Sequence, residues 1–150
     1  MRVLTIVSFG SEYTMTTAMN WDLSNVLSVT LKSSEKCPAY LQFTSKKGQQ
    51  YGRVPRNVCM FPETWAALRE LQPRLMEDLT GDSQRANPRK LYPNWEVEVR
   101  DFKGLEYVCF SQWNAGAKMP KFNMTGVEYR ALLKVSDEIE AGVKGIKQDD

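Results

Sequence analysis

The chain has 150 residues, of which 42% are hydrophobic and 25% are charged, and its formal net charge is +2. This length and composition are typical of a globular protein that buries a core, and they argue against disordered and fibrous classes. The chain contains no histidine, the commonest general base and metal ligand, and no glycine-rich phosphate-binding motif. We therefore expect neither an enzyme nor a cofactor.

The cysteines and the distribution of apolar residues indicate the compartment. Cys37, Cys59 and Cys109 are far apart and form no Cys-x-x-Cys pair, which is typical of reduced thiols. No run of residues approaches the roughly 18 apolar positions of a membrane span, and the N-terminal segment lacks signal-peptide features. We expect a soluble intracellular protein in a reducing compartment, cytoplasm or nucleus, without membrane contact.

In the first half of the chain, hydrophobic periodicity and turn residues predict several strands followed by a helix. Gly48 suits a hairpin turn. Pro62 suits the first turn of the helix, whereas Pro73 should kink it, because proline lacks a backbone N–H. The predicted strands are 2–9, 21–32, 39–44 and 50–60, with 10–20 as a loop or edge segment and 63–79 as the helix.

The second half repeats this order after a polar linker at 81–92. Gly104 should form one turn and residues 113–117 the next, while Pro120 should interrupt the strand that contains it. Thr125 is a candidate N-cap for the helix that follows. The predicted strands are 95–100, 106–112 and 118–124, and the helix runs to 143.

Three blocks of the first half match blocks of the second half in the same order. Residues 60–68 match 124–132 at an offset of 64, residues 40–43 match 107–110 at 67, and residues 20–22 match 94–96 at 74. We infer an internal duplication. It predicts an α+β fold, with residues 1–150 forming one compact domain of two tandem ββββα-type repeats at 20–80 and 93–144, joined by the linker 81–92.

The charges are distributed unevenly within each predicted repeat. Residues 36–62 contain five Lys or Arg and no acid, and residues 107–127 contain two and no acid, whereas both following helices are acidic. A basic strand region therefore precedes an acidic helix in both copies, which the net charge hides.

Single-stranded nucleic acid offers phosphates and exposed base faces, so its binders combine cations with stacking aromatic residues. The first-copy candidates are Lys46, Lys47, Tyr51, Arg53 and Arg56. The second-copy candidates are Trp113, Lys118 and Lys121, with Arg100 and Lys103 nearby. Trp65 and Tyr129, on the helices, are better explained as core or interface residues than as base platforms, whereas Tyr40 and Tyr107 suit base stacking and sheet packing equally well.

Residues 113–143 contain an aromatic residue, a basic turn, a short strand and a capped helix with Tyr129 in its first turns. This order resembles the C-terminal half of the positive cofactor four family of single-stranded-DNA-binding coactivators. Two such modules in one chain resemble the Whirly family and related guide-RNA-binding proteins of mitochondria. The resemblance covers 20–79 and 94–143. It implies curved antiparallel sheets that present nucleic-acid-binding faces, with the two helices packed as an intrachain pseudo-dimer.

Within that resemblance, the basic strand of the family corresponds to Lys118 and Lys121, and through the repeat to Arg53 and Arg56. We expect a non-enzymatic protein that binds single-stranded nucleic acid, with DNA favoured and little sequence specificity. It would act in transcription, replication or recombination as a homo-oligomer, a dimer or tetramer. Two alternatives stay open: an RNA-binding protein of the same fold, and a protein-interaction module that docks an acidic partner.

Overall fold

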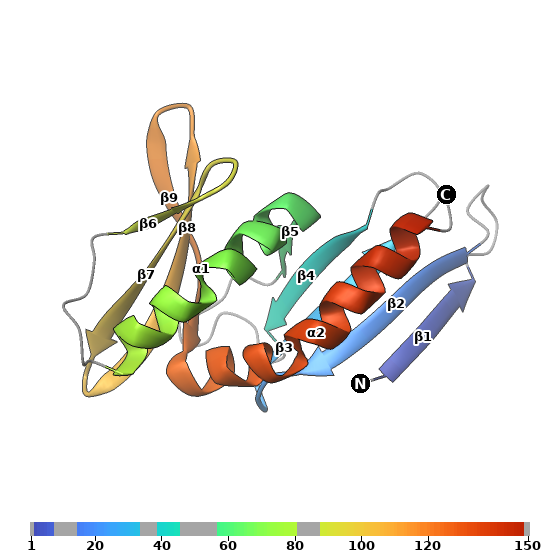
Figure 1. The fold of residues 1–150 in the computed structure, drawn as a ribbon, viewed down its shortest axis with the longest axis horizontal. Helices are drawn as coiled ribbons and strands as arrows, with labels where there is room; N and C mark the ends of the chain where they lie inside the picture. Colours follow the sequence, from blue (N-terminus) through green and yellow to red (C-terminus); the bar gives the residue numbers. More distant parts are fainter. Residues whose placement is uncertain (1, 8–14, 34–38, 46–56, 81–87, 149–150) are drawn as a thin grey trace.

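The computed structural model describes residues 2–7, 15–33, 39–45, 57–80 and 88–148, and every structural statement below concerns these residues. They form two open antiparallel sheets, each followed by a helix, which confirms the predicted α+β fold (Figure 1). Sheet A contains β1 (Arg2–Val7), β2 (Met15–Asp22), β3 (Leu27–Ser33), β4 (Tyr40–Ser45) and β5 (Asn57–Met60), and α1 (Pro62–Thr80) follows it. Sheet B contains β6 (Arg89–Leu91), β7 (Trp95–Phe102), β8 (Leu105–Asn114) and β9 (Ala117–Thr125), and α2 (Gly126–Gln148) follows it.

Helix α1 packs against β6 and β7 of sheet B, while α2 packs against β3 of sheet A as well as β8 and β9 (Figure 1). Each helix thus covers strands of the other repeat. The buried side chains of both sheets and both helices form one hydrophobic cluster. Within it the Phe122 ring stacks between Phe43 and Phe110, at centroid distances of 4.8 and 4.6 Å, and so joins the two sheets.

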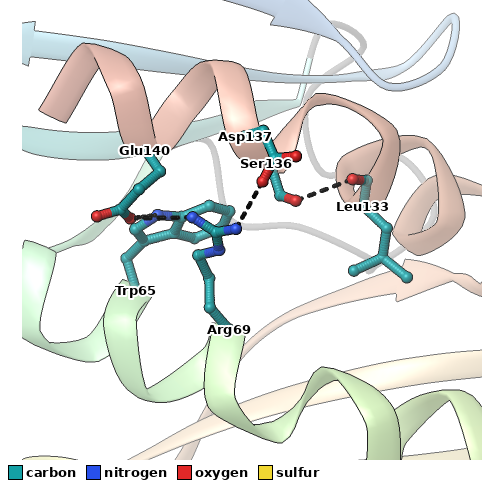
Figure 2. Close-up of polar contacts among 6 residues, drawn as sticks. All are labelled: Trp65, Arg69, Leu133, Ser136, Asp137 and Glu140. Carbon is teal, nitrogen blue, oxygen red and sulfur yellow. Dashed lines mark hydrogen bonds and ion pairs between the residues drawn. The ribbon is translucent and has the colours of Figure 1, made fainter.

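The two helices also contact each other through polar groups (Figure 2). The Trp65 indole N–H donates to Glu140 at 3.0 Å, and the Arg69 guanidinium lies 2.7 Å from Asp137 and 3.5 Å from Glu140. Ser136 on the same face of α2 donates to the carbonyl of Leu133 at 2.9 Å. The acidic side of α2 therefore faces the start of α1.

Strand register confirms two of the three sequence matches. In the first copy Leu41 pairs with Met60 and Phe43 with Val58. The second copy pairs Val108 with Met124 and Phe110 with Phe122, which are the positions related by the offsets of 67 and 64. Trp65 and Tyr129 are both buried and lie at the same place in the first turn of their helices. The internal repeat is therefore present in the fold.

The third sequence match is wrong. Trp21 lies near the end of β2, whereas Trp95 begins β7, and β7 is the counterpart of β3 rather than of β2. Leu27 pairs with Ser45 at the β3 position that corresponds to Trp95 of β7. The shared Asn-Trp dipeptide is thus a coincidence of composition, not a relic of the duplication.

This error arose because the predicted strand 21–32 is in fact two strands. The chain reverses between β2 and β3, where the Ser24 hydroxyl accepts hydrogen bonds from the N–H groups of Val26 and Leu27 at 3.2 Å each. A serine turn of this kind contains no glycine or proline, so the sequence offered no strong turn signal. Segment 10–20, predicted as a loop or edge, contributes to β2 in the interior of the sheet, and linker 81–92 contains β6.

The β7–β8 and β8–β9 hairpins of sheet B turn on two residues each. Lys103 and Gly104 have φ of 52° and 82°, and Ala115 and Gly116 have φ of 53° and 81°. Positive φ at both central residues is the type I′ geometry that matches the twist of adjacent strands. The turn predicted at Gly104 is confirmed, whereas the prediction of Trp113 in a turn is wrong, because Trp113 lies on β8.

The predictions made for Thr125, Pro120 and Pro73 can be compared with the structure. The Thr125 hydroxyl accepts from the N–H of Glu128 at 3.1 Å, and the Glu128 carboxylate accepts from the N–H of Thr125 at 2.9 Å. This reciprocal capping box confirms the predicted start of α2. Pro120 lies where β9 shifts register against β8, as predicted. Helix α1 continues through Pro73 as a single element.

Candidate nucleic-acid interface

Side chains alternate across a strand, and paired residues of adjacent strands share a face of the sheet. Val97, Phe110 and Phe122 face the core, so the residues between them face away from it. We call this opposite side the outer face of sheet B. It comprises Lys90 of β6, Glu96, Glu98, Arg100 and Phe102 of β7, Leu105, Tyr107, Cys109, Ser111 and Trp113 of β8, and Lys118, Pro120, Lys121 and Asn123 of β9.

At one end of this face, Trp113 and Lys118 lie opposite each other on β8 and β9 and converge on Glu96 of β7. The Lys118 Nζ lies 3.1 Å from a Glu96 carboxylate oxygen, and the Glu96 side chain is only 13% exposed. The hydrogen bond from the Trp113 indole, and then the nearby Lys118 charge, hold the pKa of Glu96 below its ordinary value, while burial opposes this shift. Trp113 itself remains 40% exposed.

The opposite end of the same face combines apolar residues with cations. Phe102 and Leu105, which are 60% and 56% exposed, pair with each other beside the β7–β8 turn. The Lys103 Nζ lies 5.4 Å from the centre of the Phe102 ring, which is a cation–π distance. Arg100 is exposed, pairs with Tyr107 across the strands and lies 3.9 Å from Glu98.

The second-copy candidates predicted from sequence thus gather on or beside one surface. Arg100, Trp113, Lys118 and Lys121 lie on the outer face of sheet B, and Lys103 lies in the adjacent turn. The first-copy candidates lie outside the described residues: Lys46, Lys47, Tyr51, Arg53 and Arg56.

Three features of this surface were missed from the sequence. Phe102 and Leu105 are exposed because the two-residue turn between them places both on the outer face. The alternation of Trp95, Val97 and Val99 indicated that the intervening acids face outwards, but not that Glu96 meets Trp113 and Lys118. That contact requires the register of three strands.

The outer face of sheet A differs in character where the structure describes it. Thr30 donates to Asn20 at 2.7 Å, and Thr44 donates to Asn57 at 3.1 Å. Each of these hydrogen bonds links a neutral hydroxyl to a neutral amide on the adjacent strand, from β3 to β2 and from β4 to β5. Sheet A also pairs a cation with a ring, because Lys32 lies opposite Tyr40, whose ring meets the exposed Phe61 at 6.5 Å. Among the described residues, however, more cations lie on or beside the outer face of sheet B.

Among the described helices, neither has the combination of length and apolar character that a membrane crossing needs. The described residues also contain no group of three or more His, Cys, Asp or Glu side chains placed to hold a metal ion. Comparison of the chain with family models, with curated proteins and with solved structures gives no match.

Proposed function

We propose that the chain binds single-stranded nucleic acid, with DNA as the expected ligand, across the outer face of sheet B. The observation that carries the proposal is the partly exposed Trp113 ring opposite Lys118, on the sheet face that also presents Lys121, Tyr107 and Arg100. Bases stack on aromatic rings and phosphates pair with cations, so this combination suits an unpaired strand better than a duplex, whose bases are already stacked.

The dimensions of the face support several nucleotides. Trp113 and Tyr107 lie six residues apart on β8 and on the same side of the sheet, which is roughly 20 Å at about 3.3 Å per residue. Two such platforms contribute roughly 2–6 kcal/mol of stacking. Arg100, Lys103 and Lys121 would neutralise about three phosphates, which implies a log–log salt slope near −2.

The finer proposal is a non-enzymatic, positive-cofactor-four-like or Whirly-like protein with low sequence specificity. It would act in transcription, replication or recombination, as a homo-oligomer in a reducing intracellular compartment. Its support is the tandem arrangement of two antiparallel sheets, each followed by a helix. RNA remains the alternative ligand, because stacking and phosphate contacts do not read the 2′-hydroxyl.

Tryptophan fluorescence tests the proposal directly. All four tryptophans lie in the described part of the chain, and Trp21, Trp65 and Trp95 are buried, so added ligand chiefly reaches Trp113. We expect a single-stranded oligonucleotide to quench the emission at about 50 mM salt, and to bind more weakly at about 200 mM. Trp113→Phe should abolish the signal, and Lys121→Ala should flatten the salt slope.

A duplex of the same length is the matched control ligand. Equal affinity for duplex and single strand, or no change in emission at low salt, would refute the proposal. Anisotropy of a labelled oligonucleotide measures the same affinities without relying on Trp113.

The second candidate is a protein-interaction module that docks an acidic partner. The exposed Phe102–Leu105 pair, flanked by Arg100 and Lys103, favours an acidic segment that also carries apolar residues. Under this alternative Trp113→Ala leaves nucleic-acid affinity unchanged, whereas Phe102→Ser abolishes binding of a labelled acidic amphipathic peptide.

A further inference from the structure

We infer that Glu96 is a positioning residue of the outer face of sheet B, which holds the Trp113 ring by its N–H edge and occupies the place beside Lys118 that a phosphate must take. This inference rests on the proposed function. It goes beyond it by assigning a role to an acid, a residue type that by itself weakens the binding of an anionic ligand.

Glu96 is suited to this role by its position on β7. Lys118 reaches it from β9, across β8, and its Nζ lies 3.1 Å from the carboxylate. Trp113 lies opposite Lys118 on β8, and its indole N–H, which can only donate, is the main cause that lowers the pKa of the same carboxylate. One half-buried carboxylate thus serves both a long flexible side chain and a large ring.

The backbone of Trp113 is held by Asn94 and not by Glu96. A substitution of Glu96 should therefore affect the Trp113 side chain alone. The Trp113 N–H donates to the Asn94 carbonyl at 2.7 Å, and the Asn94 amide donates to the Trp113 carbonyl at 2.7 Å. These bonds keep the end of β8 in place. Removing the carboxylate of Glu96 should therefore free the indole without displacing the strand.

The ion pair with Glu96 should also change how Lys118 contributes to the binding of a phosphate. A Lys118 that is paired with Glu96 forms a neutral group and releases no counterion when a phosphate approaches. Glu96→Gln removes the charge but keeps an oxygen acceptor for the indole. We expect it to tighten binding of a single-stranded oligonucleotide roughly three- to tenfold at about 50 mM salt. The log–log salt slope should steepen by about 0.7, the value of one added phosphate contact.

Glu98→Gln is the matched control. Glu98 lies on the same strand and face, and its substitution changes the net charge by the same amount, but its ion-pair partner is Arg100 at 3.9 Å. A general effect of net charge predicts equal gains in affinity for both variants. A positioning role predicts a larger gain for Glu96→Gln, which disappears when Lys118 is also replaced by alanine.

Iodide quenching of the free protein tests the position of the Trp113 ring without any nucleic acid. In Glu96→Ala the indole loses its acceptor, so iodide should quench tryptophan emission more strongly than in wild type, while Glu96→Gln and Glu98→Ala behave as wild type. Unchanged quenching in Glu96→Ala, or equal affinities of the Gln variants at positions 96 and 98, would overturn the inference. Wild-type protein that binds no oligonucleotide would instead refute the proposed function, whatever the quenching result.

Discussion

Replacing Tyr129 by phenylalanine should stabilise the protein. Tyr129 is fully buried in the first turn of α2, and its hydroxyl has no hydrogen-bond partner among the described residues. Desolvation also raises the pKa of this hydroxyl above its ordinary value, so it stays neutral. An unsatisfied buried hydroxyl costs about 1–3 kcal/mol. We expect Tyr129→Phe to raise the free energy of unfolding by about 1 kcal/mol and Tm by about 2–4 °C.

The internal repeat identifies the position from which this hydroxyl would receive a partner. Trp65 occupies the corresponding position of α1 and donates to Glu140 of α2 (Figure 2). At the offset of 64 between the helices, the α1 residue that corresponds to Glu140 is Met76, whose thioether is only a weak acceptor. One copy thus retains a polar contact that the other copy lacks.

Urea denaturation followed by circular dichroism measures these differences. Trp65→Phe is the matched control and should lose about 2 kcal/mol, because its indole N–H is bonded to a carboxylate. Met76→Gln should supply the missing acceptor, so that Tyr129→Phe stabilises the wild type but destabilises the Met76→Gln protein. A loss of more than about 1 kcal/mol in the single variant Tyr129→Phe would refute the reasoning, since it would mean that the hydroxyl is satisfied.

Three further predictions concern stability. Asp78→Asn should cost about 3 kcal/mol in urea denaturation, because Arg89 donates to the buried Asp78 carboxylate at 3.0 and 3.2 Å and would lose its counterion; an unchanged midpoint would contradict this. Ala115→Gly should raise the free energy of unfolding by about 1 kcal/mol, because φ of 53° strains alanine but not glycine; a lower Tm would argue against strain there. The pKa of Glu96 is lowered in the folded protein, so its contribution to stability is present above the ordinary value of 4.5 and is lost as pH falls through the folded value. The Tm difference between wild type and Glu96→Gln should therefore shrink below pH 4.5, and a difference that grows on acidification would have the wrong sign.

The type and order of most elements were predictable because their signals are local. The capping box at Thr125 and Glu128 requires residues three positions apart, and the alternation from Trp95 to Val99 requires only a strand. The repeat was also visible in the sequence, as matched blocks of residues. The strand register confirms it, because corresponding residues pair in the same way in both copies. The turn at Ser24 escaped prediction because its hydroxyl replaces the glycine or proline that usually marks a reversal.

By itself, the sequence determined a duplicated α+β chain with a basic, aromatic strand region, since periodicity, caps and composition are properties of neighbouring residues. Only the tertiary structure decided that each helix covers strands of the other repeat. It also decided that Glu96, Trp113 and Lys118 meet, although they come from three different strands. Such contacts depend on strand register and on the packing of distant segments, which no local pattern encodes.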